Sequence, residues 1–178
     1  KWEHQLFPLC WNEIKNHYTF ANAYERLEEF LIFGMYPEVV TETKKQKILL
    51  QLAGSYLYKD ILELVNIKKP DLLMKLLNAL ALQLGSEVSY NELSKILGVD
   101  RMTVVNYIDL LEKAFVIFRL HPYSSNQRNE ITSKPKIYFY DNGIRNAIIG
   151  QFNPLENRQD LGALFENFFI SEKIKNLT

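Results

Sequence analysis

The stretch EVSYNELSKILGVDRMTVVNYIDLLEKAFVIFRL, residues Glu87–Leu120, predicts two short helices joined by a tight turn and followed by a strand. Gly98 lies between the two helices, and glycine ends a helix readily because it adopts the left-handed conformation at little cost. Val99 should fill the turn beside it. Apolar spacing places three side chains on one face of the first helix: Leu93, Ile96 and Leu97.

The second helix should begin after Asp100, whose carboxylate can accept hydrogen bonds from the free backbone N–H groups of the first turn. Apolar residues then recur at the spacing of one buried helical stripe: Val104, Ile108, Leu111 and Phe115. The segment Phe115–Leu120 is mostly β-branched and aromatic and predicts a strand. Helix, glycine-containing turn, helix and strand is the order found in a winged helix-turn-helix.

The remaining pattern is mainly helical, with one further strand, Lys136–Tyr140, expected to pair with Phe115–Leu120 as an antiparallel hairpin. Polar residues form the hairpin tip, which would be the wing. Alternating residues from Trp2 to Leu6 suggest a short strand at the start. Helices are expected at Ala21–Phe33, Lys44–Val65, Leu72–Leu84, Ile144–Ile149 and Leu161–Leu177. The predicted fold class is therefore mainly α (α+β).

Composition limits the function classes. The chain of 178 residues is 47% hydrophobic, and 21 basic residues balance 21 acidic ones. This balance argues against extensive phosphate contact, although it permits a local basic patch. Cys10 is the sole cysteine, which excludes an internal disulfide and a cysteine-rich zinc site and fits a reducing cytoplasm. No apolar run has membrane-spanning length. The chain begins at Lys1 and stops inside an expected helix, so we expect a piece of a longer protein.

A series of phrases resembles one protein family, a group of archaeal and bacterial AAA+ ATPases. The phrases match in order and spacing across nearly the whole chain: KWEHQLFPLCWNEI, FGMYPEVV, SYLYKDIL, VSYNELSKILGVDRMTVVNYIDLLEKAFVIFRLHPY, KIYFYDNGIRNAI and GALFENFFISEK. One departure is Met35, where the family commonly has a second glycine.

The resemblance implies a full-length protein with an N-terminal P-loop ATPase that uses ATP and Mg²⁺. In this chain it implies a remnant of the AAA+ core at residues 1–20, a helical region at 21–70 and a winged helix at 71–140. Residues 141–178 would start a truncated α/β domain similar to the PD-(D/E)XK nuclease fold. The chain contains no G-x-x-x-x-G-K-[ST] motif and no acidic Walker B strand, so no ATP hydrolysis and no bound cofactor are expected from it alone.

Glu166 in LFENFF matches the helix glutamate of that nuclease fold. The strands that would carry the other metal-binding residues are expected beyond Thr178, so we favour an ordinary helix residue over a catalytic remnant. Asp141 precedes Asn142-Gly143 and is better explained as a turn-forming residue than as a catalytic one. The histidines are scattered without metal-ligand spacing, and no metal site is expected.

The candidate DNA-binding residues lie on the second helix and beside it. Arginine can bind guanine through two hydrogen bonds, and asparagine can do the same with adenine. The helix candidates are Arg101, Thr103, Asn106 and Tyr107, with Lys95 on the preceding helix. The wing candidates are Asn126, Gln127, Arg128 and Lys134. Against DNA binding stand three carboxylates, Asp100, Asp109 and Glu112, although Asp100 should be occupied as a cap.

Three functions therefore stay open. The first is a regulatory, DNA-binding fragment of an AAA+-type ATPase, with double-stranded DNA and its own ATPase domain as partners. The second is a winged-helix module for protein interaction or oligomerisation. The third is part of a metal-dependent nuclease completed elsewhere. The basic cluster KKQK at Lys44–Lys47 is interpreted as a solvated helix start rather than a binding patch.

Overall fold

The computed structural model describes residues 7–18, 20–56, 70–122 and 133–177, which form a mainly helical structure with one two-stranded antiparallel sheet. The N-terminal helices are α1 (Trp11–His17), α2 (Phe20–Glu25), α3 (Leu27–Phe33), α4 (Pro37–Thr41) and α5 (Lys45–Gln51), followed by a π-helical turn, Leu52–Tyr56. The central elements are α7 (Pro70–Leu82), α8 (Tyr90–Leu97), α9 (Arg101–Lys113), β1 (Ile117–Leu120) and β2 (Lys136–Phe139). The chain continues with α11 (Asn142–Ile148), a 3₁₀ turn (Leu155–Asn157) and α12 (Leu161–Lys175).

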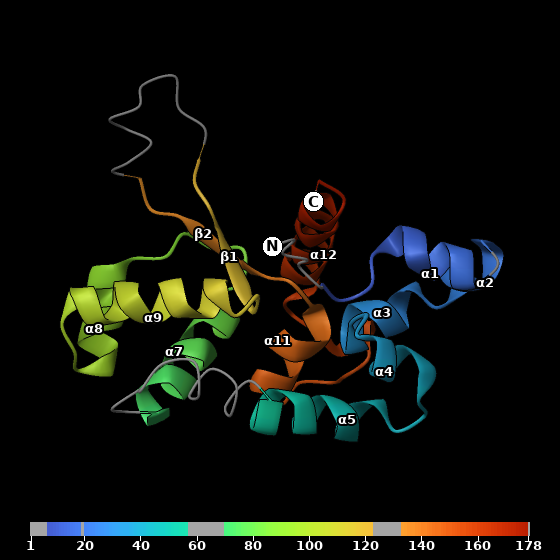
Figure 1. The fold of residues 1–178 in the computed structure, drawn as a ribbon, viewed down its shortest axis with the longest axis horizontal. Coiled ribbons are helices and arrows are strands. Elements are labelled where there is room, and N and C mark those ends of the chain that lie inside the picture. The colour runs from blue at the N-terminus through green and yellow to red at the C-terminus, as the bar shows by residue number, and fades with distance from the viewer. Residues whose placement is uncertain (1–6, 19, 57–69, 123–132, 178) are drawn as a thin grey trace, which may run out of the picture.

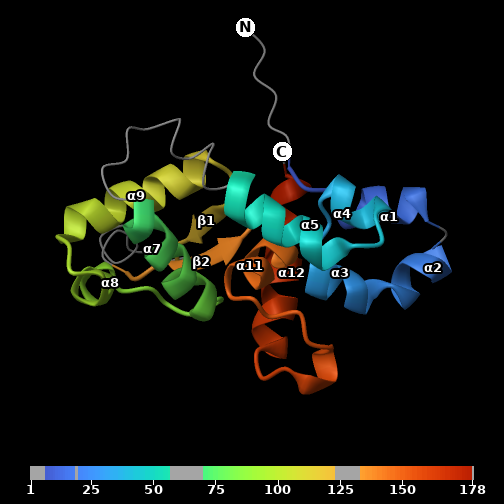
Figure 2. The ribbon, with the colours of Figure 1, turned by 90° about the horizontal axis from the view of Figure 1, so that it is seen from below.

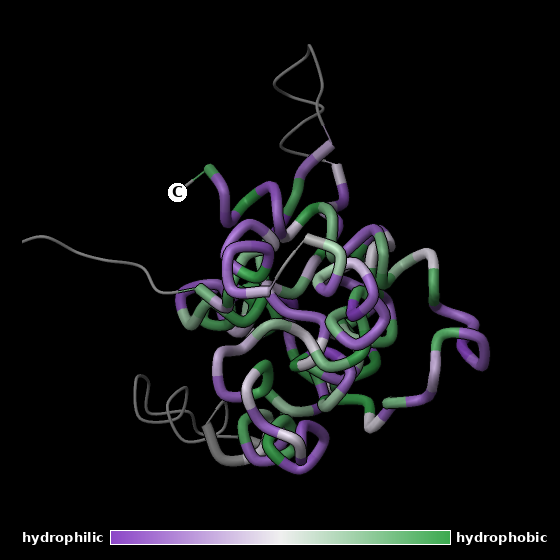
Figure 3. Tube along the Cα trace, turned by 90° about the vertical axis from the view of Figure 1, so that its right-hand side faces the viewer, coloured by the Kyte–Doolittle hydropathy of each residue, from purple (hydrophilic) through white to green (hydrophobic). Residues whose placement is uncertain are grey.

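The elements lie in two groups joined by the C-terminal helices. Helices α1–α4 lie at one end and α7–α9 with the hairpin at the other, while α11 and α12 lie between them (Figures 1 and 2). Apolar and polar segments alternate along the chain, as expected where each helix buries one face (Figure 3). Two apolar clusters result, and α12 contributes Leu164 to the larger cluster and Phe168 to the smaller one. α12 therefore packs on both groups.

The turn between α8 and α9 follows the sequence prediction. Gly98 is left-handed, with a φ of 66°, and ends α8. The Asp100 carboxylate caps α9 by accepting a hydrogen bond from the Thr103 backbone N–H at 2.9 Å. Ser89 caps α8 in the same way by accepting from the Glu92 backbone N–H. These local caps fix both ends of α8 and the start of α9, because they satisfy backbone groups that a helix terminus leaves unpaired.

The predicted apolar stripes are confirmed in part. Three of the four predicted α9 positions, Val104, Ile108 and Leu111, are fully buried, as is Leu93 on α8. Ile96 is 62% exposed, so its placement on the buried face of α8 was wrong. Phe115 lies beyond the end of α9 with a φ of 54°. Its half-buried ring contacts two other aromatic rings, those of Phe7 and Tyr140, instead of extending the helical stripe.

The predicted antiparallel hairpin is confirmed in the described residues. β1 pairs with β2 in the register Ile117↔Phe139 to Leu120↔Lys136, so both strands are slightly shorter than expected. Residues 123–132, which include the predicted hairpin tip, lie outside the described residues. The strand predicted at the N-terminus and most of the second half of the helix predicted at 44–65 lie outside them too.

Two corrections concern the N-terminal helices. The segment predicted as one helix, residues 21–33, is divided at Arg26 into α2 and α3. The extended residue expected before Pro37 is present, since Tyr36 has a ψ of 135°, but Pro37 then begins α4, a helix that the sequence reading missed. Proline fits the first helical position because its backbone N–H would be unpaired there in any case.

The contact between α3 and α11 depends on two glycines. A Cβ atom at Gly143 would collide with the backbone carbonyl of Phe33, and one at Gly34 would collide with the Asp141 carboxylate. Gly34 also has a φ of 71°, a conformation that side-chain-bearing residues rarely adopt. The backbones of α3 and α11 therefore approach more closely than larger residues would permit.

Candidate functional site

The exposed face of α9 carries two of the sequence candidates. Arg101 lies in the first turn and is exposed, and Asn106 is exposed one to two turns further along the helix. Met102, between them on the same side, is 60% exposed. The other two candidates on α9 point elsewhere: the Thr103 hydroxyl donates to the Asp100 carboxylate at 2.6 Å, and Tyr107 is half-buried against the larger apolar cluster. Arg101 and Asn106 are thus the polar side chains that α9 presents outward from its first half.

Asp100 is occupied as the sequence analysis expected. Its carboxylate accepts from both the hydroxyl and the backbone N–H of Thr103. Both hydrogen bonds lower the pKa of Asp100, and the bond from the Thr103 hydroxyl has the larger effect. Since its oxygens serve as the cap of α9, they are directed at the helix N-terminus.

The other two carboxylates on α9 share one partner, Arg119 of β1. The Arg119 guanidinium donates to Asp109 Oδ1 at 2.7 Å and also to Glu112, and the Arg119 backbone N–H donates to Glu112 Oε1 at 2.7 Å. Partial burial is the largest single influence and lowers the pKa of Arg119, but the interactions with Glu112 and Tyr90 together outweigh it, so the pKa is raised overall. Sequence reasoning missed Arg119, because nothing in the strand pattern indicates which helix carboxylates it meets.

Tyr90, the first residue of α8, connects the two arginines. The Arg101 guanidinium carbon lies 5.8 Å from the centre of the Tyr90 ring, within the range of a cation–π contact. The Tyr90 side chain also interacts with Arg119 and raises its pKa. Residues of α8, α9 and β1 therefore meet at one place beside the exposed face of α9.

The remaining basic candidates lie around this unit. Lys95 on α8 and Lys134, just before β2, are both exposed. Arg128 lies outside the described residues, as do Asn126 and Gln127. Lys113 at the end of α9 is exposed as well.

Glu166 is held by hydrogen-bond donors on the hairpin. Its carboxylate accepts from the Tyr138 hydroxyl at 2.6 Å and from Lys136 Nζ at 3.0 Å. The hydrogen bond from Tyr138, and after it the one from Lys136, lower the pKa of Glu166. Burial, together with the bond to Glu166, raises the pKa of Tyr138. Among the residues that the structure describes, no three His, Cys, Asp or Glu side chains gather as a metal site would need. Through its hydrogen bonds to Tyr138 and Lys136, Glu166 therefore links α12 to β2.

A buried polar cluster surrounds α11. Asp141 accepts from the Ile144 N–H at 3.0 Å and from the Met35 N–H at 2.7 Å. It therefore caps α11, which begins at Asn142, so the residues expected to form a turn, Asn142-Gly143, are instead the first residues of that helix. Burial raises the pKa of Asp141. Asn146 donates to the Ile32 carbonyl at 2.8 Å, which bonds α11 to α3. Asn167 of α12 bonds both the N–H and the carbonyl of Phe139, in the manner of a neighbouring strand.

The charged part of this cluster centres on Asp160. Its carboxylate pairs with the guanidinium groups of Arg145 and Arg158, both nearly fully buried. Arg145 also donates to the Ala81 carbonyl at 2.8 Å, which ties α7 to α11. Although burial alone would raise it, bonds from Arg158 and Arg145 lower the pKa of Asp160 to about 2. The sequence predicted a short helix at Arg145 but did not reveal the cluster.

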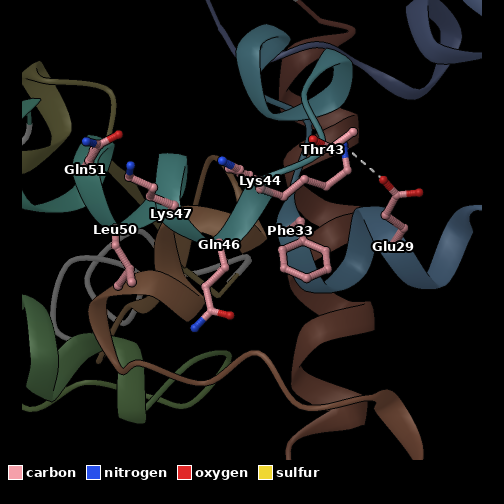
Figure 4. Close-up of a pocket in the computed structure, with 9 residues that line it drawn as sticks. Glu29, Phe33, Thr43, Lys44, Gln46, Lys47, Leu50 and Gln51 are labelled. Atoms are coloured by element: carbon pink, nitrogen blue, oxygen red, sulfur yellow. Dashed lines mark ion pairs between the residues drawn. The ribbon is translucent and has the colours of Figure 1, made fainter.

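A separate pocket of about 800 Å³ lies between α3 and α5. Figure 4 shows Glu29 and Phe33 on one side and Lys47, Leu50 and Gln51 on the other. Lys45 pairs with Glu29 at 3.1 Å and donates to the carbonyls of Val39 and Val40, so it ties α5 to α3 and α4. Lys44 and Lys47 are exposed, in keeping with a solvated helix start.

The family described as Domain of unknown function (DUF8612) matches residues 24–155, and this chain belongs to that family. An uncharacterized protein of Haemophilus influenzae is 28% identical over 87% of this chain and 43% of its own length. Two uncharacterized proteins of Methanocaldococcus jannaschii are 29% and 26% identical, over 62% and 94% of this chain and 24% and 40% of their own lengths.

The chain thus spans less than half the length of the curated relatives it matches. No solved structure matches it significantly. Among the described residues, no helix combines the length and the apolar character needed to cross a membrane.

Proposed function

We propose that this chain is the regulatory, DNA-binding part of a longer AAA+-type ATPase, and that α8, α9 and the β1–β2 hairpin act as a winged helix. In this proposal α9 enters the major groove of duplex DNA, and the hairpin approaches the neighbouring backbone. The order of helix, tight turn, capped helix and antiparallel hairpin supports the proposal.

One observation carries the proposal. The first half of α9 presents Arg101 and Asn106 to solvent, while its apolar stripe is buried and the Asp100 carboxylate caps the helix. Arginine discriminates guanine and asparagine discriminates adenine through paired hydrogen bonds in the major groove. In a helix-turn-helix protein, the residues near the start of the second helix are those that contact base edges.

The surrounding charges supply contacts to the DNA backbone. Lys95, Lys113 and Lys134 are exposed on α8, α9 and the strand entry. Such contacts make affinity depend on salt, because each neutralised phosphate releases counterions. Since the whole chain is electrically neutral and few basic residues surround α9, we expect moderate affinity that weakens as salt rises.

The ATPase part of the proposal concerns the longer protein. The resemblance places a P-loop domain before this chain, and the relatives are more than twice its length. ATP turnover there would reposition the winged helix on DNA. If the full-length protein hydrolyses ATP at a rate indifferent to DNA and binds DNA with an affinity indifferent to nucleotide, this coupling is wrong.

Fluorescence anisotropy with a labelled duplex tests the DNA part directly. Arg101→Ala should weaken the binding free energy by about 1–3 kcal/mol, which raises the Kd about 5- to 150-fold, since it removes the strongest base contact expected from α9. Lys173→Ala on α12 is the matched control, because it removes the same charge from an exposed site on another helix. Equal affinity of Arg101→Ala and the wild-type chain would contradict the proposal.

A second candidate function is protein interaction through a different face. A groove of about 440 Å³ lies between α7 and α8, and its lining includes Leu82 and Ile96, which are 67% and 62% exposed. Exposed apolar side chains at neighbouring positions are typical of interaction surfaces. If the chain self-associates in sedimentation experiments and Ile96→Ser abolishes this while no duplex binding occurs, the second function replaces the first.

A further inference from the structure

A carboxylate lies in the middle of the α9 face that the proposed function assigns to DNA. Residues three and four apart are neighbours on a helix, so Asp109 lies beside Asn106 and Lys113. Its side chain is 41% exposed. A free carboxylate at this position would repel a phosphate backbone placed against Asn106.

In the structure the Asp109 carboxylate is not free, because it is paired with an arginine. Arg119 on β1 donates to Asp109 Oδ1 at 2.7 Å, and the same guanidinium pairs with Glu112. The Arg119 backbone N–H occupies the second Glu112 oxygen. One arginine therefore binds both carboxylates in the second half of α9 and draws them toward the hairpin.

The pairing is also connected to the base-contacting residue of the proposal. The Tyr90 ring lies within cation–π range of the Arg101 guanidinium, and the Tyr90 side chain also raises the pKa of Arg119. Arg119 is 23% exposed at its side chain, so its interactions are screened less by salt than those of a fully exposed pair. Its position among α8, α9 and β1 lets it set both the charge and the orientation of its neighbours.

We propose that Arg119 is a positioning residue for DNA binding. It neutralises Asp109 and Glu112 in part and holds their carboxylates toward β1, so that phosphates can approach α9. The inference rests on the proposed function, and it requires no contact between Arg119 and the DNA.

The test compares duplex affinities of the whole chain in anisotropy titrations at low salt. Arg119→Gln should weaken binding about three- to tenfold, because two carboxylates lose their counter-charge near the DNA. Adding Asp109→Asn and Glu112→Gln to it should restore the affinity to the wild-type value or better. A purely structural role predicts instead that the triple variant binds as weakly as Arg119→Gln.

A second variant covers the case in which Arg119→Gln does not fold, which circular dichroism detects. Asp109→Asn with Glu112→Gln, Arg119 being kept, should bind duplex more tightly than the wild-type chain. Unchanged or weaker binding by this folded double variant overturns the inference.

The outcomes also separate this inference from the proposed function. If the wild-type chain binds duplex and Arg101→Ala weakens it, while Arg119→Gln binds as the wild type does, only the role of Arg119 is wrong. If the wild-type chain binds no duplex at low salt, both proposals are overturned.

Discussion

The buried cluster around α11 and the exposed face of α9 are both rich in polar residues, but they use them in opposite ways. Around α11 the carboxylates, amides and guanidinium groups bond one another or backbone groups. In the described part of the chain, no buried side-chain nitrogen or oxygen lacks a hydrogen-bond partner. On α9, Arg101 makes no ion pair within the described residues and contacts only the Tyr90 ring among the interactions found there.

This difference separates polar residues that hold the fold from polar residues that remain available to a ligand. Buried polar groups are costly unless they are paired, so the pairs around α11 are expected to govern stability. Exposed groups contribute little to stability and can exchange water for a ligand at small cost. Substitutions in the two regions should therefore affect different measurements.

The largest effect is expected where α3 meets α11. Gly143→Ala should lower the free energy of unfolding by about 3 kcal/mol or more, because its Cβ would overlap the backbone carbonyl of Phe33 and neither backbone can move independently. Chemical denaturation measures this. Gly162→Ala on α12 is the control, since a Cβ there meets open space, and it should be neutral or stabilising. Equal stability of the two variants would mean that the close approach is not important.

The elements that the sequence predicted correctly are those set by neighbouring residues. Gly98 ends α8 and Asp100 begins α9 through contacts within a few residues, and Val104, Ile108 and Leu111 follow a local period. Such features depend on the chain's immediate chemistry, so they can be recognised without knowing the fold.

The features that the sequence did not reveal depend on contacts between separate elements. Arg119 meets α9 because β1 runs back beside that helix, and Asn146 bonds Ile32 across more than a hundred residues. Ile96 has the spacing of a buried residue, yet no described element covers it. Of the α9 candidates for DNA contact, Thr103 and Tyr107 have local or core partners that periodicity alone did not indicate.

The second-largest effect is expected at Asp160 and concerns stability in acid. The pKa of Asp160 is about 2 in the folded protein, below its ordinary value of 3.8, so its pairing stabilises the fold above pH 3.8. This contribution should be lost as the pH falls toward 2 and should amount to about 2 kcal/mol.

Denaturation at pH 7 and at low pH tests this, with Asp160→Asn as the comparison. The variant should be less stable than the wild-type chain at pH 7, and the difference should shrink as the pH falls. A constant difference at every pH would contradict the pairing of Asp160 with Arg145 and Arg158.

The smallest effect is expected at Glu166. Glu166→Gln removes an ion pair whose side chains are each 41% exposed, and exposed pairs contribute at most about 1 kcal/mol. The free energy of unfolding should therefore change by less than this amount, because glutamine can still accept a hydrogen bond from Tyr138. A loss of several kcal/mol would place Glu166 with the buried cluster and not with the exposed residues.

One measurement tests the contrast between the two regions most directly. Side-chain amide signals of a ¹⁵N-labelled chain can be followed by NMR while duplex DNA is added at low salt. The account predicts that the Asn106 amide shifts on α9 while the buried Asn146 and Asn167 amides stay in place. Unchanged Asn106 signals with bound DNA, or no binding at all, would contradict the assignment of α9 as the DNA-contacting helix.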